Sequence, residues 1–221
     1  MKPRNFRPKS TVGIIISGIL GCTLGFLIAF GVLVAKPIPM GYTPPKNSEK
    51  NNAYIVLGKN TGGSNWYALQ KAFLSPQQVR LTVNEASLNL WVKNLYRGYK
   101  PVPSQSKLEL LPLTPNFHLY DGKLQIIFPL QLKVGGKQKL KVNFVTIGKI
   151  VEGKDGFRFI PENSYLGSAL FPSFAGGGAF FYEKLMTAFS GLSEFPMYKE
   201  AWKSLSLAEI TGDLLKLERL Q

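Results

Sequence analysis

The chain has 221 residues, of which 45% are hydrophobic and 18% charged, with 27 Lys and Arg against 13 Asp and Glu. This composition excludes a wholly disordered chain, because it provides enough apolar side chains for a folded core. The length suits a membrane anchor followed by one domain of ordinary size. Since Cys22 is the single cysteine, internal disulfides and Cys-based metal centres are excluded as well.

The first 35 residues indicate a basic tail and a membrane anchor. Residues 1–11 carry four basic residues and no acidic one, and residues 12–35 carry no charge. A helix over residues 12–35 measures roughly 36 Å, enough to cross a hydrocarbon core about 30 Å thick. Positive charge resists translocation. We therefore expect a single-pass protein of the inner (cytoplasmic) membrane, with a cytoplasmic N-terminus and a periplasmic or otherwise extracytoplasmic C-terminal domain.

Two alternative interpretations of this segment fit less well. A cleaved signal peptide has an apolar region of about 7–15 residues, which is shorter than this one. A lipoprotein cleavage site before Cys22 would be followed by a polar tether, whereas the apolar run continues to Ala35. The segment is therefore predicted to remain as an uncleaved signal anchor.

Residues 36–53 are rich in Pro, Asn and Lys, which predicts a linker, and residues 54–221 are predicted to form the exported domain. Without the four basic residues of the tail, 23 Lys and Arg face 13 Asp and Glu, a net charge of +10. Gly58 and Gly63 suggest a phosphate-binding loop, but the Gly-Lys-Ser/Thr ending of that motif is absent. Ser64 or Asn65 is expected to cap a short helix that ends near Phe73.

The next stretch, residues 79–96, is predicted to run from a strand directly into a helix that begins near Val83. Thr82 and Glu85 have the spacing of a capping box, in which each side chain satisfies a free backbone N–H group. Apolar residues follow at helical spacing and indicate one buried face. Glu85, Asn89 and Lys93 share another face, which we interpret as a cap and a polar edge. Because Asn has poor helix propensity, Asn89 is expected to bind a neighbouring strand or loop.

The middle of the chain predicts a long antiparallel meander. Apolar side chains alternate without interruption over residues 124–134, so one face of this strand must be covered. Gly135 and Gly136 then predict a hairpin turn, and residues 137–151 return as a second strand with a bulge near Gly148. Residues 157–161 begin a third strand.

The polar side of the first hairpin is strongly basic and is predicted to contact anionic lipid head groups. Nucleic acid is not expected as a partner, because an exported, tethered domain does not normally meet it. The lysines of this predicted membrane-surface set are Lys133, Lys137, Lys139, Lys141 and Lys149.

The C-terminal third predicts helices followed by strands. A glycine loop at residues 176–178 precedes a helix with an apolar stripe, and a second short helix follows at about residues 194–205. Residues 207–220 are expected to form strands that turn at Gly212 and Asp213. The stripe is expected to face the first meander strand and enclose an apolar ligand groove, with the glycine loop acting as the hinge of a lid. The candidate groove residues are Leu124, Ile126, Phe128, Leu130, Leu132, Phe181, Leu185 and Phe189.

Catalytic chemistry is not indicated by any motif. His118 is the single histidine and is interpreted as structural, and no paired-carboxylate, nucleophile or metal-ligand pattern is visible. We therefore expect a protein that is not an enzyme and that uses neither a cofactor nor a metal ion.

The stretch from Leu81 to Trp91, read with the order helix, long meander, helix and final strand, resembles small single-span bacterial envelope proteins with TULIP-type, lipid-binding-like domains. The resemblance implies a helix along a curved antiparallel sheet that encloses an apolar groove. The predicted fold class is thus α+β, a long curved antiparallel sheet packed with helices behind one transmembrane helix. The expected function is binding of a lipid or other apolar ligand at the cell envelope. The alternative is a scaffold or assembly subunit of a membrane complex, including a subunit similar to the bitopic component of lipopolysaccharide export.

Overall fold

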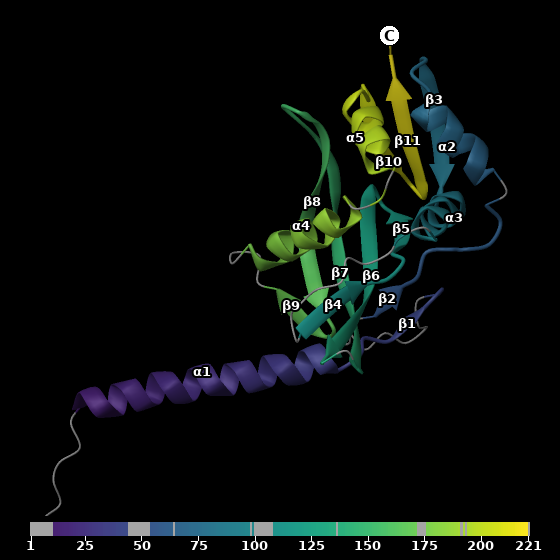
Figure 1. The fold of residues 1–221 in the computed structure, drawn as a ribbon. Coiled ribbons are helices and arrows are strands. Elements are labelled where there is room, and N and C mark those ends of the chain that lie inside the picture. The colour runs from purple at the N-terminus through teal and green to yellow at the C-terminus, as the bar shows by residue number, and fades with distance from the viewer. Residues whose placement is uncertain are drawn as a thin grey trace, which may run out of the picture.

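The computed structural model describes residues 11–43, 54–63, 65–97, 99, 108–135, 137–171, 176–190, 192 and 194–220. Helix α1 (Thr11–Ala35) projects away from the rest of the molecule (Figure 1). By length and composition it can cross a membrane, and its apolar side chains are exposed along it. The predicted apolar helix is confirmed, and its C-terminal end lies against the domain.

The rest of the described chain has the predicted α+β architecture. The helices are α2 (Trp66–Leu74), α3 (Glu85–Tyr96), α4 (Gly177–Phe189) and α5 (Phe195–Lys203). The strands of the first half are β1 (Met40–Gly41), β2 (Ile55–Val56), β3 (Val79–Asn84), β4 (Leu108–Pro112) and β5 (Asn116–Tyr120). Those of the second half are β6 (Lys123–Val134), β7 (Lys137–Gly153), β8 (Gly156–Leu166), β9 (Ala169–Phe171), β10 (Leu207–Thr211) and β11 (Leu214–Arg219).

The main sheet is the predicted antiparallel meander. Its strand order is β4-β6-β7-β8-β9, with β5 also paired to β6. The predicted turn between β6 and β7 is confirmed, and Gly135 in it has the positive φ of 56° that favours glycine. The predicted bulge is also present, because the β7–β8 register shifts between Ile147 and Gly148.

Pro129 interrupts neither pairing of β6. On one side β6 pairs first with β5 and then with β4, and the junction between these two partners falls at Pro129. The Pro129 carbonyl accepts a hydrogen bond from the Leu113 N–H on that side. The missing N–H of proline therefore lies where no partner strand requires it.

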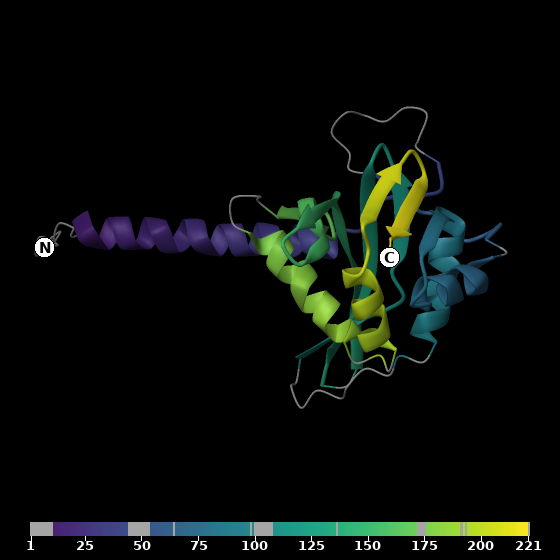
Figure 2. The same ribbon diagram turned by 90° about the horizontal axis from the view of Figure 1, so that it is seen from above.

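A second, three-stranded sheet has the order β10-β11-β3. The predicted turn of the C-terminal strand pair is confirmed, since Thr211 pairs with Leu214 around Gly212. The pairing of β11 with β3 joins two segments that lie more than a hundred residues apart in the sequence. Figure 2 shows β10 and β11 standing next to the main sheet, with α5 leading into them.

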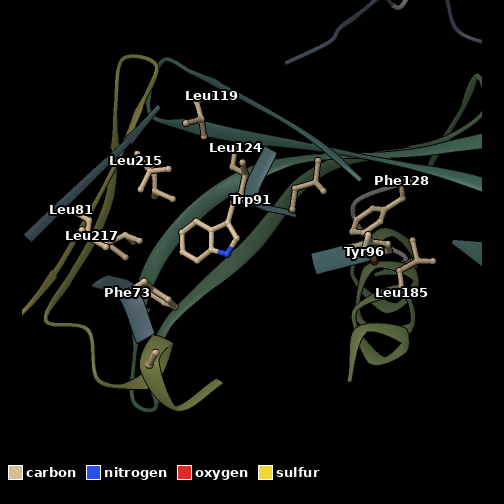
Figure 3. Close-up of a cluster of buried hydrophobic side chains, with 14 of the residues drawn as sticks. Phe73, Leu81, Trp91, Tyr96, Leu119, Leu124, Phe128, Leu185, Leu215 and Leu217 are labelled. Atoms are coloured by element: carbon tan, nitrogen blue, oxygen red, sulfur yellow. The ribbon is translucent and has the colours of Figure 1, made fainter. Parts of the chain in front are cut away.

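Both faces of the β6–β7 pair are covered. One face contributes Leu124, Ile126 and Phe128 to a large core that also takes in the helices and the second sheet (Figure 3). On the opposite face, Ile127 and Val145 form a smaller cluster with Ile38 and Ile55.

The predicted linker over residues 36–53 is wrong in its first part. Ile38 is only 4% exposed, and Met40 and Gly41 form β1, which pairs in parallel with β2. Burial of Ile38 against Ile127 favours this docking over a free stalk. Residues 44–53 lie outside the described residues.

Candidate functional site

The junction of β3 and α3 differs from the prediction. Thr82 lies within β3 and pairs with Lys216, and the helix begins at Glu85. Asn84 is the N-cap, because its side chain accepts a hydrogen bond of 2.8 Å from the Ser87 N–H. The predicted Thr82–Glu85 capping box is therefore wrong: a two-residue shift of the helix start leaves Thr82 in the strand.

The Glu85 carboxylate instead joins three segments. It accepts hydrogen bonds from the Lys59 N–H at 2.5 Å and from the Leu119 N–H at 2.9 Å. Nδ1 of His118 lies 2.6 Å from the same carboxylate. Although burial by itself raises the pKa of Glu85, the hydrogen bonds from His118, Lys59 and Leu119 outweigh it and lower the pKa below its usual value.

Asn89 lies one turn further along α3 and acts on the same segments. Its amide donates to the carbonyls of Lys59 and Phe117 and accepts from the Phe117 N–H at 2.7 Å. The Asn89 side chain thus pairs with both the N–H and the carbonyl of Phe117, as the backbone of a neighbouring strand would. The prediction that Asn89 binds a neighbouring strand or loop is confirmed. Lys93, predicted for the same face, is exposed.

Asn116, at the start of β5, completes this polar cluster. Its side chain accepts from the Gly58 N–H at 2.8 Å and donates to the Gly58 carbonyl at 3.0 Å. A Cβ atom on Gly58 would collide with the Phe117 carbonyl, and one on Gly63 would meet the backbone of Ala86 at 2.7 Å. The two glycines that suggested a phosphate loop therefore serve close approach of backbones.

The side chains of the cluster hold separate segments of the chain together. The oxygen atoms of Glu85 and Asn89 accept hydrogen bonds from backbone N–H groups, so they are occupied in holding the segment around Lys59 against α3 and β5. His118 also stacks on Tyr120, with ring centroids 5.1 Å apart. Within the described ranges, no three His, Cys, Asp or Glu side chains form a potential metal site. The geometry is that of a structural clamp.

Six of the predicted groove residues come together in the large core: Leu124, Ile126, Phe128, Leu130, Leu185 and Phe181. Leu132 is not part of that core. Leu124, Ile126, Phe128, Leu130 and Leu185 are buried, and Leu132 and Phe181 are half-buried. Phe181 lies against Phe144 of β7, with ring centroids 4.8 Å apart, so α4 does pack on the β6–β7 face as expected. The side chain of Phe189 lies outside the described residues.

A continuous row of phenylalanine rings leads from α1 into this core. Phe30 of α1 is 6.2 Å from Phe171 of β9, measured between ring centroids, and Phe171 is 6.0 Å from Phe181 of α4. From Phe181 the row continues to Phe144 and then, over 6.3 Å, to Phe128. We call these five residues the aromatic row. Phe171 is the link that the sequence did not indicate, because a three-residue edge strand has no detectable period.

The start of α4 is more constrained than a free hinge. The predicted glycine loop at residues 176–178 is shorter than expected, since Gly177 and Gly178 belong to the helix. A Cβ atom on Gly178 would lie 2.6 Å from the side chain of Ser164 on β8. This close approach fixes the first turn of α4 on the sheet, and only Gly176 retains the positive φ of a turn.

The predicted basic set is split by the structure. Lys133, Lys137 and Lys141 belong to the hairpin end of β6 and β7, whereas Lys149 lies near the opposite end of β6, where it forms an ion pair of 3.4 Å with Glu162. The lysines at the hairpin end are separated from Lys149 by about ten residues along β7, or roughly 33 Å. The side chain of Lys139 lies outside the described residues.

Comparison with known proteins adds no relative: no family model, no curated protein and no solved structure matches the chain.

Proposed function

We propose that this protein is a membrane-anchored envelope protein whose exported domain binds an acyl chain or similar apolar ligand taken from the bilayer. The aromatic row carries the proposal. It begins at the half-buried Phe30 on a helix that suits a membrane span and ends at Phe128, which is 1% exposed in the core. A hydrocarbon chain leaving the bilayer along this row would meet apolar side chains throughout.

The binding place in this proposal lies between α4 and the sheet. The row crosses this interface between Phe171, Phe181 and Phe144. An acyl chain inserted between these rings would replace ring contacts by other apolar contacts, so the side chains would stay out of water. This placement agrees with the lipid-binding-like domains that the stretch around Glu85 resembles.

Photolabelling of the full chain tests the proposal. The protein is reconstituted in phosphatidylcholine vesicles that contain a phospholipid with a diazirine at the end of one acyl chain. After irradiation, mass spectrometry locates the labelled peptides. We expect label on the buried peptides that contain Phe144 and Phe128. Label confined to α1 and exposed residues would contradict ligand uptake and favour the scaffold alternative.

A matched pair of variants localises the binding place. Phe181→Trp adds volume on the row and is expected to reduce labelling near Phe144. Phe159→Trp is the control and adds the same volume away from the row. Phe159 of β8 lies beside Tyr182 of α4, with 5.0 Å between their ring centroids. Equal effects of the two substitutions would argue against passage along the row.

The proposed topology places the N-terminus in the cytoplasm and the domain outside the inner membrane. It is supported by the basic tail and by the apolar α1. Protease added to spheroplasts of cells that produce the protein is expected to digest residues 54–221. Protection of that domain until the membrane is dissolved would reverse the orientation.

A further inference from the structure

The C-terminal end of α1 is completed by residues of the domain. The last carbonyl groups of a helix have no partner within the helix. The Ser168 N–H donates to the Leu33 carbonyl and its hydroxyl group to the Lys36 carbonyl, both at 2.9 Å. The turn between β8 and β9 therefore caps α1.

Gly167 makes this approach possible. Its φ is 56°, and a Cβ atom there would collide with the backbone of Val34. Its N–H donates to the Asn143 carbonyl of β7, so the same turn is also anchored in the main sheet. The end of α1 and the sheet are thus joined by backbone contacts on both sides of Gly167.

The ring contact between Phe30 and Phe171 sets the depth of the domain. Phe30 lies five residues before Ala35, where α1 ends, which corresponds to about 7 Å along the helix axis. Phe171 contacts it at that level, and Gly177 and Phe181 at the start of α4 contact Phe171 in turn. When α1 spans a bilayer, β9 and the first turns of α4 therefore lie at the level of its apolar boundary.

The same region exposes large apolar side chains. Leu170 of β9 is 52% exposed and Phe180 of α4 is 62% exposed. Figures 1 and 2 both show β9 and the start of α4 on the side of the domain from which α1 emerges. Two such side chains next to a span suit the interface of a bilayer, where apolar and aromatic groups are favoured.

We infer that the domain is seated directly on the bilayer, with Leu170 and Phe180 immersed in its interfacial layer. The inference rests on α1 being a membrane span, as in the proposed function, but it does not require a bound ligand. Basic residues complement it: Lys141 is exposed and lies two residues from Asn143 along β7, and Lys137 is exposed at the hairpin end. Anionic head groups are the matching lipid component.

Spin labels measure this immersion in the full chain. Cys22→Ser removes the native thiol, and Leu170→Cys or Phe180→Cys then carries the label in vesicles of phosphatidylcholine and phosphatidylglycerol. The ratio of collision with oxygen to collision with a water-soluble nickel chelate reports depth in the bilayer. Tyr67→Cys is the control, because Tyr67 is 65% exposed on α2, which both figures place on the side of the domain away from α1.

We expect a several-fold higher ratio at positions 170 and 180 than at position 67. Ratios equal to that of position 67 would overturn the inference and place the domain in water above the membrane. Labels that collide with neither oxygen nor the nickel chelate would also overturn the inference, because protein and not lipid would then cover the surface. A high ratio without photolabelling of Phe144 would retain the seated domain and reject ligand binding, so the two proposals fail separately.

Discussion

Asn89 is the polar residue whose removal we expect to cost most at the clamp. Asn89→Ala leaves the N–H and carbonyl of Phe117 without their partner, and a buried group left unsatisfied costs about 1–3 kcal/mol. Chemical denaturation of the purified protein measures the loss.

Asn94→Ala provides the matched control on the same helix. Among the residues that the structure describes, the Asn94 amide donates to the Leu90 carbonyl within α3, at 2.8 Å. This substitution is expected to change the free energy of unfolding by no more than about 0.5 kcal/mol. Equal losses for the two variants would show that the hydrogen bonds between Asn89 and Phe117 add no stability of their own.

Glu85 predicts a defined dependence of stability on pH. Its folded pKa lies below the usual 4.5, so the carboxylate contributes stability above that value and loses it as the pH falls through the folded pKa. Glu85→Gln replaces one carboxylate oxygen by an NH2 group, so one of the two N–H groups of Lys59 and Leu119 loses its acceptor and faces amide protons. The variant is expected to destabilise the protein at pH 7. The difference in Tm between wild type and variant is expected to shrink below pH 4.5. A difference that is constant from pH 7 to pH 3 would exclude the ionised carboxylate as the cause.

These two residues show how far single positions can be predicted. Asn89 was identified because an Asn in mid-helix lacks a local reason to be there. Glu85 was misinterpreted because its spacing from Thr82 matches a local motif, whereas its partners Lys59 and Leu119 come from distant segments. Local motifs can be recognised in a sequence, whereas hydrogen-bond partners from distant segments cannot.

At the level of elements, the joint between α1 and the domain is expected to depend on Gly167. Gly167→Ala introduces a side chain at a positive φ and against Val34, and strain of this kind costs about 1–3 kcal/mol. The distance distribution between spin labels on Cys22 and on Tyr67→Cys is expected to broaden as α1 detaches.

Gly212→Ala is the control for backbone strain alone. Gly212 has a φ of 61°, but the space around its Cβ position is open. Its substitution is expected to leave the distance distribution unchanged. Broadening in both variants would attribute the effect to general loss of stability and not to the joint.

Elements with a clear period were predictable, and short ones were not. The alternation in β6 and the glycines that follow it located the meander, and the apolar run located α1. The two-residue strand β1 carries no period, so residues 36–53 were interpreted as a linker. The pairing of β11 with β3 depends on contacts across most of the chain, which no local pattern encodes.

At the scale of the whole molecule, the binding proposal raises the question of whether the core around Phe128 is tightly packed or has spare volume. Phe128 is buried at the inner end of the aromatic row, against Phe144. Phe128→Trp is expected to overpack the core and lower the free energy of unfolding by about 1–3 kcal/mol. Chemical denaturation checks this value. A variant as stable as the wild type would indicate spare volume at the end of the row and a preformed groove.

The rigid joint at Ser168 makes the inclination of the domain a function of bilayer thickness. The 23 residues from Gly13 to Ala35 measure about 34 Å, so α1 is long enough to cross a core about 30 Å thick with some tilt, and a core of about 27 Å requires a larger tilt. Because β8 and β9 hold the end of α1, the domain leans with it. The inclination of the domain relative to the membrane therefore depends on the thickness of the bilayer. Energy transfer from position 67 to acceptors at the membrane surface, in vesicles of increasing acyl length, measures that angle.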